Sequence, residues 1–298
     1  MVDNTRGILW MSASVAVFIV NDALMKLATE AAPAVEVIGV RGLFATLWCA
    51  LVLLSTGGWR RLDGIFHPAV FLRGVLEAAA ALTYLVALHY TPFAIATAIN
   101  LSTPLFLAVL AVVVLKEDVR WRRWTAIAVG FGGVLMVIQP HPGDANIWTW
   151  VVVGSSLLGA IRDVLGRYVP ARVPTAVMSV WSAASVAIVG CALAAIEGWQ
   201  PLNTRALVLL ICASLLLAAG YQFLMLALRS QAEFAVIGSF RYGSVLGAIA
   251  IGYLVWGDVP NLLALAGIVV VVASGLYILR RQRERHSPLQ EDVQRQVP

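Results

Sequence analysis

Charged side chains are scarce in this sequence. Only 12% of the 298 residues are Asp, Glu, Lys or Arg, whereas about a quarter of a typical soluble domain is charged. A soluble fold of this length must cover its surface with polar side chains, which so few charges cannot do. Hydrophobic residues make up 60% of the chain, in runs that approach the roughly 20 helical residues needed to cross a bilayer core. The composition therefore indicates an integral membrane protein.

Histidine and cysteine are also sparse, and the motifs of several enzyme classes are missing. The four histidines fall at span ends, in loops or in the tail, where none is buried as a base. The sequence has neither the H-E-x-x-H of zinc peptidases nor the G-x-x-x-x-G-K-[ST] of nucleotide-binding loops. Cys49, Cys191 and Cys212 are odd in number and lack metal-ligand spacing. We therefore expect no enzyme, no catalytic residue, no metal and no cofactor.

Ten hydrophobic runs follow one another, separated by prolines, glycines and charged clusters. A membrane β-barrel would instead show short segments of alternating polarity. The pattern predicts an all-α integral membrane protein with ten transmembrane helices, at residues 7–28, 35–56, 69–88, 93–115, 124–138, 147–168, 175–196, 206–228, 234–256 and 262–279.

Basic residues are sorted between the two sets of alternating connections. One set, which includes both ends of the chain, carries nearly all the Lys and Arg residues, whereas the opposite set carries only Arg205. The positive-inside rule then predicts that both termini are cytoplasmic. The net charge of +5 does not indicate nucleic-acid binding, because the basic residues form no patch.

The chain resembles itself when it is displaced by 141 residues. This offset places residues 21–26 on 162–167, Pro33 on Pro174, residues 93–94 on 234–235, and residues 116–117 on 257–258. Each half then holds five predicted spans, and because five is odd the second half enters the membrane from the opposite side. Inverted repeats of this kind are typical of secondary transporters that bind a solute near the midplane.

The repeat divides the chain into four parts. Residues 1–6 are predicted to be a cytoplasmic N-terminus, 7–139 a first five-helix repeat, 140–280 a second, inverted five-helix repeat, and 281–298 a disordered cytoplasmic tail. The fifth and tenth spans have almost no polar residues. They are expected to pack outside the central bundle or to mediate contacts, so that a homodimer is one open arrangement.

Several short motifs resemble those of one transporter family. They are Arg41-Gly42-Leu43-Phe44-Ala45, Thr103-Pro104-Leu105-Phe106, Trp121-Arg122-Arg123-Trp124, Trp256-Gly257-Asp258 and Ala273-Ser274-Gly275-Leu276-Tyr277. Together they resemble the EamA-type transporters of the drug/metabolite transporter superfamily, over both halves of the chain. The resemblance implies ten helices in two inverted repeats, a central cavity, and alternating access in a bacterial inner (plasma) membrane.

The resemblance is specific for the fold and weak for the solute. Members of the superfamily export amino acids and drugs, or import riboflavin and S-adenosylmethionine. Residues 3–9, with Asn21, Asp22 and Lys26, look closest to the riboflavin-uptake branch, so riboflavin uptake is the first expectation and the others remain alternatives. Outside the carrier class, a channel or a membrane enzyme stays open. The expected partners are a small-molecule solute and the lipid bilayer, with no nucleic acid.

Ionisable residues inside the spans are costly in lipid and are therefore candidates for function. Asp22 and Lys26 lie one helical turn apart, and the repeat reproduces them as Asp163 and Arg167. The two pairs are expected at opposite mouths, either as gate charges or as local ion pairs. Asp22 and Asp163 are also candidates for solute binding.

Further charged and neutral residues lie deeper in the predicted spans. Glu77 is a candidate for solute binding and proton coupling, or else for a salt bridge with Arg73 or Arg241. Arg41 and Arg162 either contact the solute or pair with acids. Ring-bearing solutes suit cavities lined by aromatic and amide groups, and the remaining solute-binding candidates are Tyr84, Asn100, Trp181, Tyr221, Gln222, Arg241 and Tyr242. Pro104 is expected to interrupt the fourth span.

Overall fold

The computed structural model is a bundle of α-helices, and it describes residues 5–55, 67–114, 121–139, 147–166, 168–170, 173–229 and 241–277. In chain order the helices are α1 (Thr5–Ala31), α2 (Ala34–Ser55), α3 (Pro68–Tyr90), α4 (Phe93–Asn100), α5 (Thr103–Val113), α6 (Trp121–Ile138), α7 (Ile147–Gly166), α8 (Thr175–Glu197), α9 (Thr204–Arg229), the short 3-10 helix η2 (Arg241–Gly243) and α11 (Ser244–Trp256). A last helix covers Leu262–Tyr277.

The helices coincide with the predicted hydrophobic spans wherever the structure describes them. Six are long and apolar enough to cross a membrane: Thr5–Ala31, Ala34–Ser55, Pro68–Tyr90, Phe93–Leu110, Ile147–Gly166 and Ala176–Glu197. Four shorter apolar helices follow the same pattern, at Trp124–Ile138, Thr204–Gly220, Ser244–Trp256 and Leu262–Tyr277. Residues 234–240, at the start of the predicted ninth span, lie outside the described residues.

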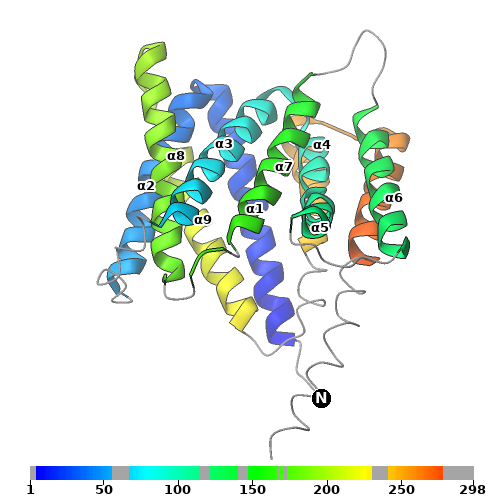
Figure 1. The fold of residues 1–298 in the computed structure, drawn as a ribbon. Coiled ribbons are helices and arrows are strands. Elements are labelled where there is room, and N and C mark those ends of the chain that lie inside the picture. The colour runs from blue at the N-terminus through cyan, green and yellow to red at the C-terminus, as the bar shows by residue number, and fades with distance from the viewer. Residues whose placement is uncertain are drawn as a thin grey trace, which may run out of the picture.

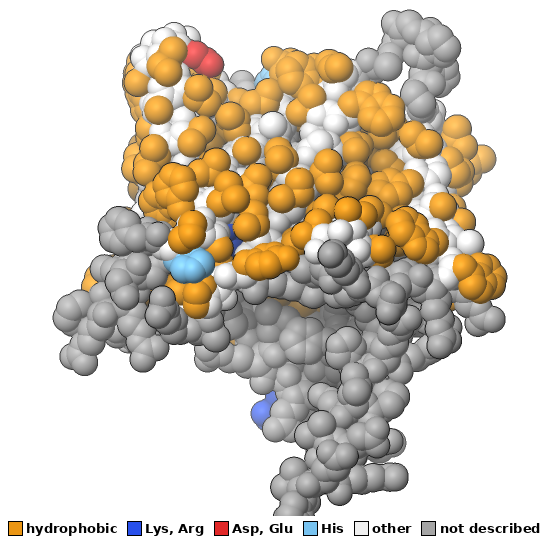
Figure 2. Space-filling view, viewed as in Figure 1, with side chains coloured by type: hydrophobic (Ala, Val, Ile, Leu, Met, Phe, Trp, Pro, Cys, Tyr) orange, Lys and Arg blue, Asp and Glu red, His pale blue; other side chains and the backbone are white. Residues whose placement is uncertain are grey.

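The surface agrees with a protein that lies in lipid. Large apolar side chains such as Leu246, Leu254 and Leu262 are strongly exposed, and orange apolar atoms cover most of the described face in Figure 2. Soluble monomers rarely expose contiguous apolar patches larger than a few hundred Å². The exposed apolar belt therefore fits helices that face lipid.

Neighbouring helices in the bundle often come from different halves of the chain. The most extensive contacts join α1 to α9, α2 to α8, and α3 to α7 and α8, and Figure 1 shows α2 beside α8 at one flank. We call the end of the bundle where α1 begins the Thr5 end and the opposite end the Ala31 end. The connection from α1 to α2 and the start of α9 meet at the Ala31 end, where the Asn203 side chain donates to the Ala31 carbonyl at 3.1 Å.

Glycines allow two of these helix pairs to approach closely. A Cβ on Gly190 of α8 would lie 2.5 Å from the nitrogen of Gly39 on α2, and one on Gly39 would lie 2.8 Å from the Cys191 nitrogen. Similarly, a Cβ on Gly267 of the last helix would lie 2.6 Å from the Gly133 carbonyl oxygen on α6. Small residues suit helix association in lipid, where packing replaces the hydrophobic drive between helices. Figure 1 shows α6 beside the last helix at the flank opposite α2 and α8.

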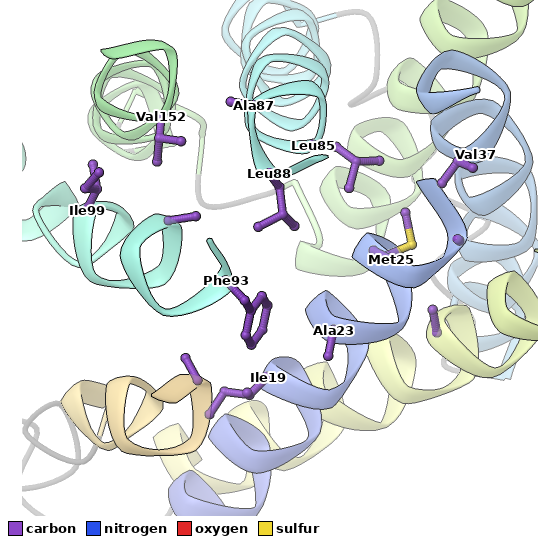
Figure 3. Packing of buried hydrophobic residues seen from close by; sticks show 14 of the residues in the cluster. Ile19, Ala23, Met25, Val37, Leu85, Ala87, Leu88, Phe93, Ile99 and Val152 are labelled. Carbon is purple, nitrogen blue, oxygen red and sulfur yellow. The ribbon is translucent and has the colours of Figure 1, made fainter. Parts of the chain in front are cut away.

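The interior is apolar where α1, α3, α4 and α11 meet. Phe93, Leu88 and Met25 are fully buried, and in Figure 3 the Phe93 ring at the start of α4 points toward the space between α1 and α11, near Ile19. The Phe93 ring also lies 5.6 Å, centroid to centroid, from the Trp256 ring at the end of α11. This packing ties the first and second halves of the chain together near the Ala31 end.

The fourth predicted span is broken between α4 and α5, at Leu101 and Ser102. Because Pro104 has no N–H, it cannot bond the Asn100 carbonyl as a helical residue would. The Thr103 hydroxyl donates to that carbonyl instead, at 2.7 Å. The predicted interruption at Pro104 is therefore confirmed, and it leaves the Asn100 side chain exposed at the break.

Thr103→Val is expected to destabilise this break, because the Asn100 carbonyl would lose its hydrogen bond. The loss should be about 1 kcal/mol, or roughly 2 °C in the apparent unfolding temperature of the detergent-purified protein. Adding Pro104→Ala should restore the stability, since alanine supplies the missing N–H. In the control Thr46→Val, a similar hydroxyl bond to the Gly42 carbonyl at 2.7 Å is lost, but that carbonyl keeps its helical partner. Equal effects at both sites would contradict the interpretation.

Candidate functional site

A cluster of polar side chains from four helices lies inside the first half of the chain. It consists of Asn21 and Asp22 on α1, Arg41 on α2, Tyr84 on α3 and Thr97 on α4, and we call it the Asp22 cluster. The Asn21 amide donates to the Asp22 carboxylate at 2.8 Å. Arg41 is near enough to Asp22 to attract its carboxylate electrostatically, and Asp22 and Thr97 are polar residues near the Tyr84 side chain.

The Asp22 cluster contains polar atoms that are buried without hydrogen bonds. Asn21 Oδ1, Arg41 Nε and Tyr84 Oη all lack a partner among the described residues. No ion pair of 4.0 Å or less joins Asp22 to Arg41 in that part of the chain. Buried polar groups in native proteins are nearly always satisfied, so each exception requires an explanation such as a ligand. The cluster is therefore the strongest candidate for a solute-binding site.

Asp22 and Lys26 do not form the local ion pair that their spacing allows. Lys26 is only 6% exposed and its ammonium donates to the Thr91 backbone carbonyl at 2.7 Å. It also lies 4.9 Å from the centroid of the Trp256 ring. Tertiary contacts have therefore replaced the local partner and leave Asp22 available for other interactions.

These contacts form a polar junction at the Ala31 end, which we call the Lys26 junction. The Glu30 carboxylate accepts a hydrogen bond from the Trp256 indole at 2.6 Å. The carboxylates of Asp258 and Glu30 attract the Lys26 ammonium electrostatically. Lys26 and Glu30 belong to α1, whereas Trp256 ends α11 and Asp258 follows it. The junction therefore links the two halves of the chain.

A second charged group lies toward the Thr5 end, and we call it the Glu77 network. Arg162 on α7 bonds Glu77 on α3 at 2.9 Å and its neighbour Asp163 at 2.8 Å. Arg73 lies 4.0 Å from Glu77 and donates to the Ser182 hydroxyl on α8 at 2.6 Å. The expected salt bridge of Glu77 is therefore present, with Arg162 as its closer partner, and the network joins α3 to α7 and α8.

Asn100 lies at the break of the fourth span, against α7. Its side-chain oxygen accepts from the Ser156 hydroxyl on α7 and from the Thr103 hydroxyl, both at the long distance of 3.4 Å. These weak contacts leave the amide able to bind another group. Asn100 therefore remains a candidate for solute contact, as the sequence predicts.

Two aromatic candidates lie against other helices instead of in the Asp22 cluster. The Trp181 indole donates to the Phe71 carbonyl at 3.3 Å and stacks on the Phe71 ring. Tyr242 is buried with its hydroxyl against Gly275 of the last helix. Helix packing accounts for both. Four further candidates cannot be placed, because Arg167 and the side chains of Tyr221, Gln222 and Arg241 lie outside the described residues.

Arg41 also lacks the acidic partner that its own helix offers. Glu36, five residues before it, is 2% exposed and accepts a hydrogen bond from the Gln200 backbone N–H at 2.5 Å. Glu36 thus ties the start of α2 to the connection between α8 and α9. Its engagement there leaves Asp22 as the acid that interacts electrostatically with Arg41.

Several residues of these groups did not stand out in the sequence. Thr97 and Ser182 are small polar residues of a kind that is common in transmembrane helices, and Thr91 contributes only a backbone carbonyl. Trp256 stands out in the sequence only as part of a family motif, which gives no indication of its contacts. Their roles depend on contacts between distant segments, for which a single sequence offers no signal.

The described residues also line an apolar cavity of about 360 Å³. It lies between α5 and α7 toward the Thr5 end and holds none of the candidate solute-binding residues. Its lining is Leu110, Val114, Ile161, Val164, Leu165 and Tyr168. Because it offers almost no polar group to orient a solute, it is a weaker candidate than the Asp22 cluster.

Comparison with known proteins points to membrane transporters. Residues 5–139 match the model of the EamA-like transporter family. The chain is 24% identical to the S-adenosylmethionine uptake transporter of Rickettsia prowazekii, over 96% of each protein. It is 25% identical to the pseudopaline exporter of Pseudomonas aeruginosa, over 89% of this chain and 93% of that protein. It is also 25% identical to the riboflavin transporter of Rhizobium johnstonii, over 72% of this chain and 70% of that protein.

The fold also matches a known crystal structure. The superposition has a TM-score of 0.64 and covers 94% of this chain and 98% of the other protein. At 15% sequence identity this likeness concerns the fold. Its coverage extends through both halves of the chain, beyond the segment that the family model matches.

Proposed function

The chain belongs, through residues 5–139, to the EamA-like transporter family of the drug/metabolite transporter superfamily, and from this membership we propose that it is a secondary transporter. It moves a small organic metabolite across the bacterial inner membrane by alternating access. The single observation that carries a solute site is the Asp22 cluster, whose buried polar atoms lack partners among the described residues.

The pairing of helices supports two inverted five-helix repeats. Helices α1 and α9 are the first and eighth spans. When the two halves are exchanged, these spans correspond to the sixth and third, which are α7 and α3. The α1–α9 contact therefore corresponds to the α7–α3 contact. Both contacts are extensive. The same exchange turns the α2–α8 contact, between the second and seventh spans, into itself. An inverted repeat requires such self-matching pairs at its pseudo-twofold axis.

The charged groups at the two ends support a gated site. In the proposed orientation, with both termini cytoplasmic, the Lys26 junction lies on the periplasmic side and the Glu77 network on the cytoplasmic side. Asp22 and Lys26 correspond to Asp163 and Arg167 in the repeat. Each group links helices that an opening must separate, so we assign gating or coupling roles to Asp22, Lys26, Glu77, Asp163 and Arg167.

S-adenosylmethionine and riboflavin are the first solutes to test. The relatives named for S-adenosylmethionine uptake include one that aligns over 96% of the chain, whereas the riboflavin relative aligns over 72%. Riboflavin remains a candidate because residues 3–9 and 21–26 resemble that branch. Export of an amino acid or drug is the further alternative, since one relative is named a pseudopaline exporter.

Counterflow in proteoliposomes tests the proposal. Vesicles preloaded with unlabelled S-adenosylmethionine or riboflavin should accumulate the labelled form transiently, saturably and only when they contain the protein. The purified protein should also be examined for bound flavin by its yellow colour and fluorescence. Uptake that neither saturates nor responds to solute on the opposite side would favour a channel and contradict a carrier.

A further inference from the structure

We propose that the apolar cavity between α5 and α7 binds one acyl chain of an anionic phospholipid, whose head group lies at the first turn of α6. The cavity has a volume of about 360 Å³. Its lining residues are Leu110 and Val114 on the α5 side and Ile161, Val164, Leu165 and Tyr168 on the α7 side. The site is separate from the Asp22 cluster and takes a component of the membrane, not a transported solute.

The cavity opens toward the lipid. Trp150 and Leu157 on α7 lie two turns apart and are both exposed, as residues on one face of a helix are when that face meets the bilayer. The same spacing of three or four residues continues from Leu157 to Ile161, Leu165 and Tyr168, which line the cavity. The lipid-facing side of α7 therefore leads into the cavity, and a hydrocarbon chain enters it from the bilayer.

The length of the cavity fits a chain in one leaflet. Ile161 and Tyr168 are seven residues apart, which corresponds to about 10 Å along a helix. The hydrocarbon of one leaflet is about 15 Å deep, half of the bilayer core. Tyr168 is exposed at the outer end of the cavity, and tyrosine gathers at the level of the lipid head groups. The cavity thus runs from head-group level into the hydrocarbon, as an acyl chain does.

The chemistry of the lining selects a hydrocarbon occupant. Every lining residue except Tyr168 is aliphatic, so a polar solute would lose its hydration there without gaining hydrogen bonds. A void between packed side chains loses dispersion contacts. Lipid chains already surround this face, and one that enters the cavity restores those contacts without leaving an apolar environment.

The outer end of the cavity lies level with the start of α6. Helix α5 runs toward the Thr5 end and α6 returns from it, so the two helices are antiparallel. They are also neighbours, because the Phe106 and Phe131 rings lie 4.9 Å apart, centroid to centroid. Val114 follows Phe106 by eight residues, and Arg123 precedes Phe131 by eight. The first turn of α6 is therefore at the depth where the cavity opens.

That first turn carries positive charge at head-group level. It reads Trp121-Arg122-Arg123-Trp124 and contains no acid. Both tryptophans are exposed, as expected of residues that anchor a helix at the interface. Arginine suits phosphate groups, and basic clusters beside a transmembrane helix attract anionic lipids. Packed helices lie about 8–10 Å apart, so a phospholipid whose chain lies beside α5 has its phosphate close to these arginines.

Native mass spectrometry of the full-length protein in detergent tests the proposal with three probes. Dioleoyl phosphatidylglycerol carries both features, dioleoyl phosphatidylcholine has the same chains without net charge, and glycerophosphoglycerol has the charge without chains. The first should bind at least fivefold more tightly than the second, and the third should not bind measurably. Equal affinity for the two phospholipids, or binding of glycerophosphoglycerol as tight as that of phosphatidylglycerol, would overturn the proposal.

Filling the cavity should weaken lipid binding. Val114 is exposed at the outer end, so Val114→Trp places a ring there without disturbing the buried core, and the affinity for phosphatidylglycerol should fall at least fivefold. The control Val129→Trp makes the same change at an exposed position of α6 outside the cavity and should bind as the parent does. If Val114→Trp fails to fold, Ile161→Phe should still weaken binding at least twofold. Unchanged affinity in the folded variant would place the lipid elsewhere and reject the site.

Removing charge should alter the choice between lipids. Arg123→Gln should lower the preference for phosphatidylglycerol over phosphatidylcholine at least twofold and leave the affinity for phosphatidylcholine unchanged. The control Arg205→Gln removes an exposed cation at the opposite end of the bundle and should keep the parent preference. An unchanged preference in Arg123→Gln would count against a head group at α6. A dimer that Val114→Trp dissociates would assign the cavity to a second copy of the chain and overturn the lipid proposal.

Discussion

Lys26→Met is expected to open the Ala31 end of the bundle and to raise access to its interior from that side at least tenfold. Lys26 is buried and donates a charge-assisted hydrogen bond to the Thr91 carbonyl, a contact worth about 1.5–3 kcal/mol. Tenfold corresponds to about 1.4 kcal/mol. Methionine keeps much of the side chain's bulk and apolar character but removes the charge and the donor.

Loss of the ammonium also affects the partners of Lys26. Glu30 accepts a hydrogen bond from the Trp256 indole. Both Glu30 and Asp258 attract the Lys26 ammonium electrostatically. Without the cation, both carboxylates lose the opposite charge that attracts them. The lost attraction acts between α1 and the segment around the end of α11, which must separate if the solute is to enter from this side.

Chemical labelling measures the effect without a known solute. A single cysteine placed at Asn100, in a chain whose Cys49, Cys191 and Cys212 are replaced by serine, reports the rate of modification by a membrane-impermeant methanethiosulfonate. The reagent is added only on the side of the membrane where the Ala31 end lies. That side is first established by tagging the N-terminus and the C-terminus. Solute exchange should fall at the same time, because a carrier must also close.

Arg205→Met is the matched control for this experiment, since Arg205 is an exposed cation at the start of α9, at the same end of the bundle. It should leave the labelling rate within a factor of two of the parent. A Lys26→Met chain that labels at the parent rate would show that the Lys26 junction does not restrict access.

Local chemistry explains which parts of the fold could be predicted. The break at Pro104 follows from a missing N–H, a property of the residue itself. The long apolar runs likewise predict helices wherever they occur, although α1 extends from Thr5 to Ala31, beyond the predicted 7–28. Polar residues at helix ends carry no apolar signal, so a prediction from hydrophobicity places such boundaries too far inward.

Partner choice in the site could not be predicted, because it depends on how distant segments meet. Asp22 and Lys26 have the spacing of an ion pair, but Lys26 lies next to Thr91, 65 residues away. Arg162 bonds Glu77 across 85 residues. A helical face indicates which residues share one side of a helix, and the packing of the other helices decides which of them become partners.

Gly190→Ala is expected to destabilise the folded protein strongly. Its added methyl group would lie 2.5 Å from the Gly39 nitrogen and 2.6 Å from the Gly39 Cα. Backbone atoms cannot move aside as a flexible side chain can, so α2 and α8 must separate. Overpacking of this kind costs about 1–3 kcal/mol. The apparent unfolding temperature in detergent should fall by roughly 2–4 °C per kcal/mol, together with the yield of monodisperse protein.

The same change on a face without neighbours isolates the steric cause. Among the described residues, no atom lies within 4 Å of the position that a Cβ would take at Gly154 on α7. Alanine is also favoured over glycine in a helix by about 1 kcal/mol. Gly154→Ala should therefore unfold at the parent temperature or above it. Gly39→Ala should resemble Gly190→Ala, since its Cβ would lie 2.8 Å from the Cys191 nitrogen. If Gly190→Ala and Gly154→Ala were equally stable, α2 and α8 would not be in the close contact that joins the two halves of the chain.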